Sequence, residues 1–125
     1  MLHRIRRVLG KYLSRGEKGA LKLFLLERKM ARCHSAGLKK IRRENLQHPQ
    51  KLNLGCGPHR KEGFLNVDLF PPAEVTLDLR RGLPFDSGCC DLIFSEHCFE
   101  HFDYPETILH LLRECHRVLR AGGGC

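Results

Sequence analysis

The sequence predicts an α/β protein in which a parallel sheet follows a basic helical extension. Short apolar segments recur in the second half of the 125-residue chain, and each ends in a polar or flexible residue. Turn-forming Gly, Pro, Asp and Ser separate these segments. A longer segment with helical spacing follows them, and such an alternation of elements is typical of a parallel sheet. We therefore expect a helical extension over residues 1–50 and the first part of an α/β domain over residues 51–125.

Charge divides the chain at the same place. Residues 1–50 contain 14 Lys and Arg against 3 Asp and Glu, a net charge of +11. Residues 51–125 contain 8 against 11, a net charge of −3. Because the basic residues are concentrated outside the expected sheet, we expect the two parts to have different roles.

The apolar residues of the extension predict helices. Those of the first segment occur at three- and four-residue spacing, with Arg and Lys between them: Leu2, Ile5, Leu9, Tyr12 and Leu13. Gly16 and Gly19 are expected to break this helix. A second helix is predicted from about Ala20, with an interruption at Gly37. Pro49 is expected to end the helical region, since helices usually end at or before the residue that precedes a proline.

Four short strands are predicted in the domain, at residues 51–54, 64–67, 74–77 and 91–94. They are followed by Gly55, Asp68, Asp78 and Ser95. Because ligands in open α/β sheets bind at the carboxyl ends of the strands, these positions are candidates for a binding site.

The segment Gly55-Cys56-Gly57 is the first candidate. A glycine pair after a buried strand permits a tight turn and lets a ligand approach the main chain. Asp68 could accept hydrogen bonds from the hydroxyls of a ribose, and Asp78 could accept one from an adenine amino group. The alternatives are an ordinary tight turn and two acids on the surface.

The spacing argues against two other nucleotide-binding classes. A dinucleotide site requires G-x-G-x-x-G and an acid about 20 residues further on. Here Arg60 occupies the place of the third glycine, and Asp68 comes early. A nicotinamide-dependent oxidoreductase is therefore the weaker alternative. The chain also lacks G-x-x-x-x-G-K-[ST], which excludes a P-loop.

Several motifs in order closely resemble class I S-adenosylmethionine-dependent methyltransferases, in particular a methyltransferase type 11-like core. The first two motifs correspond to LNLGCGP at residues 52–58 and GFLNVDL at residues 63–69. Residues 83–101 are similar to the fourth strand and its continuation, and residues 112–123 to the helix before the fifth strand. The resemblance covers roughly residues 51–125. It implies an incomplete Rossmann-like parallel sheet of about four to five strands and in-line methyl transfer from S-adenosylmethionine to an unidentified acceptor.

The resemblance also implies roles at the first two strand ends. Gly55, Cys56 and Gly57 would lie along the methionine part of the cofactor. Asp68 would hold the ribose, and Leu69 would pack beside the adenine.

At the next two strand ends, the resemblance implies that Asp78 and Leu79 contact the adenine. Ser95 and Glu96 would lie near the sulfonium.

Two departures from the family are visible. Only about seven residues separate Gly57 from the second strand, whereas a parallel crossover usually takes a dozen or more. A very short helix or a loop is therefore expected there. A helix is predicted from Pro105 to about Leu119, stopped by the glycines at 122–124. The chain would then end before the fifth strand, as a fragment without most of its acceptor pocket.

His97 and His101 are candidate bases for an acceptor that must lose a proton, because imidazole titrates near neutral pH. The alternative is that they cap or pack the helix after the fourth strand. No metal site is expected, since the spacing fits neither H-E-x-x-H nor paired C-x-x-C. The seven cysteines without C-x-x-C pairs, together with the lack of a long apolar segment, favour the cytoplasm.

The extension leaves several hypotheses open. It could be a solvated helix that packs partly on the domain, or a surface for an anionic membrane or another polyanion. Only Tyr12 and Phe24 could stack on bases, which argues against nucleic acid. A basic membrane- or polyanion-binding module with a non-catalytic cofactor fold is thus the alternative to an enzyme.

Overall fold

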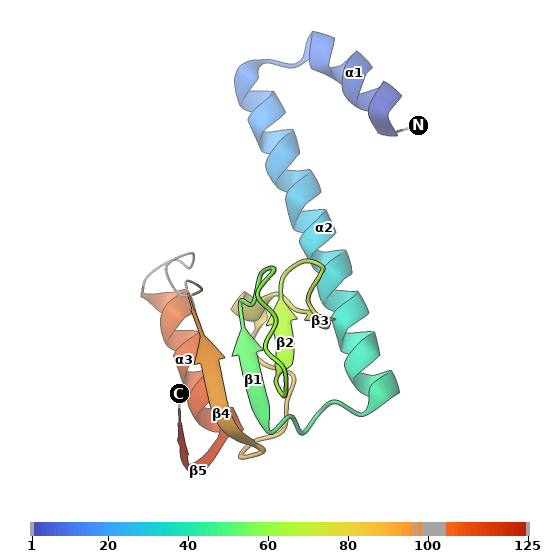
Figure 1. Cartoon of the computed structure of the whole chain (residues 1–125). Helices are drawn as coiled ribbons and strands as arrows, with labels where there is room; N and C mark the ends of the chain where they lie inside the picture. Colours follow the sequence, from blue (N-terminus) through green and yellow to red (C-terminus); the bar gives the residue numbers. More distant parts are fainter. Residues whose placement is uncertain (1, 97, 99–104, 125) are drawn as a thin grey trace.

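The computed structural model describes residues 2–96, 98 and 105–124. It contains a five-stranded parallel sheet with the strand order β3-β2-β1-β4-β5 (Figure 1). The strands are β1 (Lys51–Leu54), β2 (Leu65–Asp68), β3 (Val75–Thr76), β4 (Cys90–Ser95) and β5 (Leu119–Gly124). The helices are α1 (Leu2–Tyr12), α2 (Arg15–Glu44) and α3 (Glu106–Val118), with a short 3₁₀ turn, η1, at Leu79–Arg81. The predicted α/β, Rossmann-like fold is confirmed.

The register of the sheet aligns the strand ends. Leu54 at the end of β1 lies opposite Val67 in β2 and Ser95 in β4. The turn after β1 and the end of β2 therefore lie side by side at one edge of the sheet. Each predicted strand is present, with bounds that differ from the prediction by no more than two residues.

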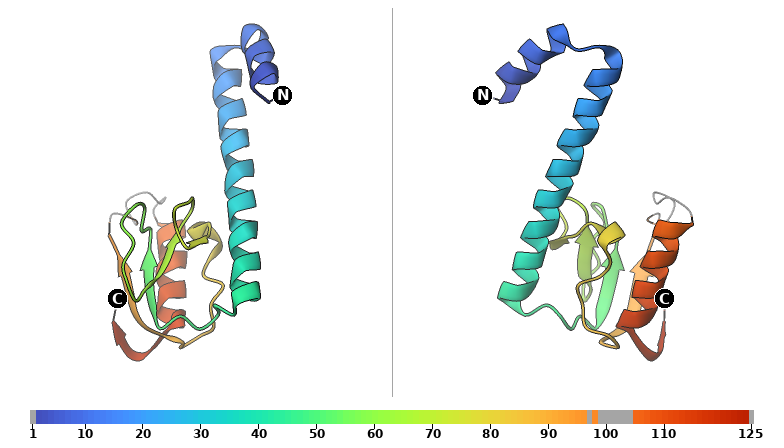
Figure 2. Two further views of the ribbon diagram at one scale, coloured as in Figure 1. Left: turned by 45° about the vertical axis from the view of Figure 1, so that its right-hand side comes forward. Right: turned by 180° about the vertical axis from the view of Figure 1, so that it is seen from behind.

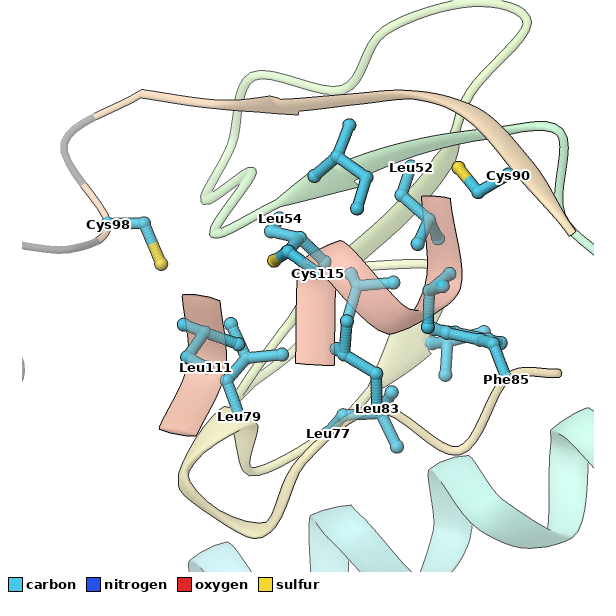
Figure 3. Packing of buried hydrophobic residues seen from close by; sticks show 14 of the residues in the cluster. Leu52, Leu54, Leu77, Leu79, Leu83, Phe85, Cys90, Cys98, Leu111 and Cys115 are labelled. Carbon is cyan, nitrogen blue, oxygen red and sulfur yellow. The ribbon is translucent and has the colours of Figure 1, made fainter. Parts of the chain in front are cut away.

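One face of the sheet carries the hydrophobic core. Leu52 and Leu54 of β1 are fully buried on this face, and α3 contributes Leu111 and Cys115 to the same cluster (Figure 3). The segment after η1 adds two more side chains, Leu83 and Phe85. Because α3 and this segment both cover the same face of the sheet, the hydrophobic core is shielded from solvent there without a helix between β1 and β2.

The opposite face of β1 and β2 is covered by a loop, as the short connection predicts. Asn53 and Asn66 occupy the central positions of these strands and are buried. The Asn53 amide donates to the backbone oxygen of His59 at 3.2 Å and to Asn66 Oδ1 at 2.9 Å. Asn66 in turn bonds both the backbone N–H and the backbone oxygen of Lys61, at 2.7 and 3.0 Å. Two asparagines thus hold the loop where a crossover helix normally packs.

The end of the chain differs from the prediction. The glycines at 122–124 do not simply stop α3, because Leu119–Gly124 forms β5 and pairs with β4. Leu119 is already extended, with ψ 135°. A side chain at Gly123 would lie 3.0 Å from the Asp91 backbone oxygen, so the missing Cβ permits the close approach of the two strands. The expectation that the chain stops before a fifth strand was wrong.

The start of α2 also differs from the prediction, because neither Gly16 nor Gly19 breaks the helix. The break lies before them, at Ser14, whose hydroxyl accepts a hydrogen bond from the Glu17 N–H at 3.2 Å. The Glu17 carboxylate accepts from the Ser14 N–H at 2.6 Å. This reciprocal capping box satisfies two N–H groups that the helix start would otherwise leave unpaired. The cap therefore outweighs the low helix propensity of the two glycines.

The predicted interruption at Gly37 is absent as well, since α2 continues through this residue to Glu44. A Cβ at Gly37 would lie 1.7 Å from the Thr76 backbone oxygen. The glycine is therefore a point of close packing between α2 and β3. Figure 2 shows the second part of α2 lying against the sheet and its first part, with α1, projecting beyond it.

None of the helices within the described residues is both long enough and apolar enough to cross a membrane.

Candidate functional site

A cavity of about 960 Å³ opens at the carboxyl ends of β1 and β2. Apart from Ser95, the residues predicted to bind a cofactor all line it: Gly55, Cys56, Gly57, Asp68, Leu69, Asp78, Leu79 and Glu96. The register of the sheet explains why these residues lie together. Parallel strands that end at the same height place the residues that follow them at the same end of the sheet. The structure therefore brings together residues from four strand ends that are separate in the sequence.

The turn after β1 depends on its glycines. Gly55 and Gly57 have φ values of +68° and +52°, in the left-handed region that favours glycine. The Gly55 and Cys56 N–H groups donate to the Val67 backbone oxygen at 2.8 and 3.2 Å, which fixes the turn against β2. A Cβ at Gly55 would lie 2.7 Å from the Cys98 side chain. Gly55 is therefore a point of close packing against Cys98, and both glycines of the turn line the cavity without a side chain.

Asp68 connects this turn to the end of β2. Its Oδ2 accepts from the Gly57 N–H and its Oδ1 from the Leu69 N–H, each at 2.7 Å. A carboxylate has about four acceptor positions. These two hydrogen bonds therefore orient the group and leave each oxygen able to accept another hydrogen from a ligand in the cavity.

Asp78 has a different environment from Asp68. Its carboxyl group is 5% exposed, and Arg80 donates to it from Nε at 2.9 Å, from Nη2 at 2.8 Å and from the backbone N–H at 3.2 Å. Burial alone would raise the pKa of Asp78, but the hydrogen bonds and charge of Arg80 outweigh it and lower the pKa. Arg80 also forms two hydrogen bonds with Glu27 of α2, both at 3.2 Å. The Asp78 carboxylate is therefore largely engaged by Arg80.

The residues after β4 are only partly described. The Ser95 hydroxyl donates to the Leu54 backbone oxygen at 3.1 Å, which ties β4 to β1, and Ser95 does not line the cavity. Glu96 does line it. The candidate bases His97 and His101 lie outside the described residues.

Other cavity residues were missed by the sequence reasoning. The loop after Gly57 contributes His59, Arg60 and Lys61. The signal for this wall was present in the sequence as two asparagines, Asn53 and Asn66, at strand positions where apolar residues are usual. Buried polar side chains require hydrogen-bond partners, and here the partner is the loop itself.

The helical extension also supplies part of the wall. Met30 of α2 is buried and lines the cavity. One turn further on, His34 Nδ1 accepts a hydrogen bond from the Asp78 N–H at 3.0 Å. Lys29 places its ammonium group 4.7 Å from the centre of the Phe70 ring, which also lines the cavity. The sequence alone assigns residues 1–50 to a separate extension and therefore does not predict these contacts.

The two cysteines at the cavity are not activated. Burial raises the pKa of the Cys56 thiol and that of the Cys98 thiol. Both therefore stay protonated at neutral pH, and neither is suited to act as a nucleophile. Within the part of the chain that the structure describes, no group of three His, Cys, Asp or Glu side chains could hold a metal ion.

The family described as a methyltransferase domain matches residues 61–125. Neither a curated protein nor a solved structure matches the chain. The matched region runs from the loop that covers β1 and β2 through Asp68 to β5, and it spans more than half of the 125 residues. The chain therefore belongs to the methyltransferase domain family.

Proposed function

We propose that the chain binds S-adenosylmethionine in the cavity at the ends of β1 and β2 and transfers its methyl group to an acceptor. The observation that carries this proposal is the pairing of the Gly55–Gly57 turn with the Asp68 carboxylate on the neighbouring strand. This pairing puts bare main chain and a hydroxyl acceptor at the same edge of a parallel sheet, where nucleotide ligands bind.

The residues present fit this cofactor in size and in chemistry. A volume of about 960 Å³ lies within the range of small-molecule sites. Asp68 retains acceptor positions for the two ribose hydroxyls. At Gly57 a Cβ would meet only Asp68 Oδ2, at 3.9 Å, so there is room for the methionine part beside the main chain at this residue. Leu69 and Phe70 supply apolar surface for the adenine.

Asp78 has a modified role in this proposal. Because Arg80 holds its carboxylate, Asp78 shapes the end of the cavity near Leu79 and Met30 more than it offers a free acceptor. An adenine there would meet two apolar side chains and a fixed ion pair. Its position would depend on α2, which holds Arg80 through Glu27.

When bound, the cofactor supplies an electrophilic methyl group on a sulfonium, and the protein supplies position and a shielded environment. Glu96, directly after β4, would lie toward the positively charged sulfonium. His97 and His101 stay predictions as bases for a hydroxyl or amine acceptor.

The direct test is calorimetric binding of S-adenosylhomocysteine and of NADH to the purified chain and to Asp68→Asn. A hydrogen bond to a charged group contributes about 1.5–3 kcal/mol, so the variant should bind S-adenosylhomocysteine about ten- to a hundredfold more weakly. Asp86→Asn is the matched control, because Asp86 is exposed and pairs with His48 away from the cavity. Its affinity should equal that of the original chain.

Other outcomes would contradict the proposal. Binding of NADH alone would favour an oxidoreductase. Equal affinity of Asp68→Asn and Asp86→Asn for S-adenosylhomocysteine would mean that Asp68 does not contact the ligand. Circular dichroism of each variant, recorded alongside, would show whether a loss of binding reflects a loss of fold.

A further inference from the structure

The first helix, α1, has an apolar row and a basic row next to each other. Ile5, Val8 and Tyr12 follow three- and four-residue spacing, and their side chains are 46%, 58% and 82% exposed. Arg4, Arg7 and Lys11 repeat the same spacing one residue earlier and are also exposed. One residue turns an α-helix by about 100°, so the two rows lie on adjacent faces. The segment LHRIRRVLGKY contains no acidic residue that could neutralise the basic row.

The first part of α2 also exposes large apolar side chains. Leu23, Phe24 and Leu26 are 65%, 60% and 44% exposed. Leu23 and Leu26 belong to the helix face that is buried further along at Met30, but no described element covers them there. We call the exposed side chains of residues 4–12 and 23–26 the N-terminal surface.

The N-terminal surface lies beyond one end of the sheet (Figures 1 and 2). Figures 1 and 2 show the first part of α2 and the whole of α1 beyond the end at which the strands finish. The stretch from Arg15 to Met30 is about 22 Å long at 1.5 Å per residue. Because the cavity opens at the same end, the surface and the cavity lie toward the same side of the molecule.

We propose that the N-terminal surface binds a membrane rich in anionic lipid, with α1 lying in the interface. A helix with an apolar row beside a basic row is suited to an anionic membrane. Its apolar side chains enter the headgroup region while its Arg and Lys side chains contact lipid phosphates. A second copy of the chain is a poorer partner, since its basic row would repel the first. On the proposed function, the cofactor cavity would then open toward the membrane surface (Figure 1).

The experiment measures co-sedimentation of the full chain with vesicles of phosphatidylcholine alone and of phosphatidylcholine mixed with phosphatidylglycerol. We expect binding to the mixed vesicles only, weakened by added salt. Ile5→Gln combined with Val8→Gln should reduce binding at least about tenfold, since apolar insertion contributes to affinity. The matched control is Leu109→Gln combined with Leu112→Gln, because these α3 leucines are similarly exposed, at 42% and 43%.

The charge is tested in the same assay. Arg4→Gln combined with Arg7→Gln should weaken binding about tenfold or more, as each basic residue near an anionic surface contributes about a factor of five. Arg43→Gln is its control, because Arg43 is exposed at the far end of α2, where its partner is Glu44. All variants are checked for helix content and for S-adenosylhomocysteine binding, which should not change.

Three results would overturn the proposal. One is the absence of binding to mixed vesicles. Another is binding to RNA that the Ile5 and Val8 substitutions leave intact, with no preference for vesicles, which would identify a nucleic-acid surface. The third is a dimer in sedimentation equilibrium that these substitutions dissociate, without vesicle binding, which would identify a second copy as the partner. Since the cofactor assay is separate, each result is distinguishable from a failure of the proposed enzymatic function.

Discussion

The two parts of α2 have the same apolar spacing but different surroundings. From Met30 onward, one face of the helix is buried against the sheet, including His34, Gly37 and Ile41. Before Met30, the same face carries Leu23 and Leu26, and both are exposed. A single 30-residue helix is therefore a structural element of the domain at one end and a projecting arm at the other.

The difference shows that the partner, and not the helix sequence alone, decides what is buried. In the second part, β3 approaches so closely that the Thr76 hydroxyl donates to the Cys33 backbone oxygen at 2.6 Å. The Lys40 ammonium donates to the Glu74 backbone oxygen at 2.6 Å in the same region. In the first part, by contrast, a Cβ at Gly16 or Gly19 would meet nothing within 4 Å.

The largest expected contrast between the two parts is at their glycines. Gly37→Ala would place a methyl group 1.7 Å from the Thr76 backbone oxygen, so α2 must move off β3. We expect a loss of about 3 kcal/mol in the free energy of unfolding, at the upper end of the usual cost of overpacking. Gly19→Ala should instead gain up to about 1 kcal/mol, because alanine is the better helix former and has room. Urea unfolding measures both, and changes of the same sign would show that the two parts do not differ in packing.

A smaller contrast is expected at two isoleucines. Ile41 is 2% exposed in the second part of α2, whereas Ile5 in α1 is 46% exposed. The change to Val removes one methylene group from each. Ile41→Val should lower the free energy of unfolding by about 1 kcal/mol, and Ile5→Val should change it by less than about 0.5 kcal/mol. Equal losses in urea unfolding would mean that α1 is also packed against the protein in solution.

The sequence was sufficient for the features that are local. The strand ends could be predicted because Gly55, Asp68 and Asp78 each follow a short apolar segment directly, and parallel strands bring their ends together. The loop in place of the first crossover helix could be predicted from its length alone. The side chains that face the same cavity thus followed from chain order and sheet geometry.

The features that depend on partners far apart in the sequence could not be predicted. From the sequence alone Gly37 is predicted to break the helix, whereas in the structure it permits the close approach of β3. Arg80 reads as a surface charge, but it binds Asp78 and Glu27 together, and the two carboxylates are 51 residues apart in the chain numbering. A glycine run at the end of the chain is equally compatible with a helix stop and with β5. In each case a contact of tertiary structure outweighed a local propensity.

The smallest contrast concerns a histidine on the buried face of α2. Burial and then the charge of Arg81 lower the pKa of His34, while Asp78 opposes them more weakly. His34 therefore stays neutral in the folded protein at a pH where it is already protonated in the unfolded chain. Its Nδ1 can then accept the hydrogen bond from the Asp78 N–H.

This shift predicts a loss of stability in acid. Between the usual histidine pKa of about 6.5 and the lowered pKa of folded His34, the unfolded chain binds more protons, so the free energy of unfolding falls as the pH falls. His34→Asn retains an acceptor for the Asp78 N–H but does not titrate, and the carboxylates contribute equally in both proteins. Urea unfolding at a series of pH values should therefore show a steeper decline for the original chain, and His3→Asn, at an exposed position of α1, should behave like it. Parallel declines in the original chain and His34→Asn would mean that protonation does not disturb the contact between α2 and η1, and that the buried part of the helix tolerates charge as the exposed part does.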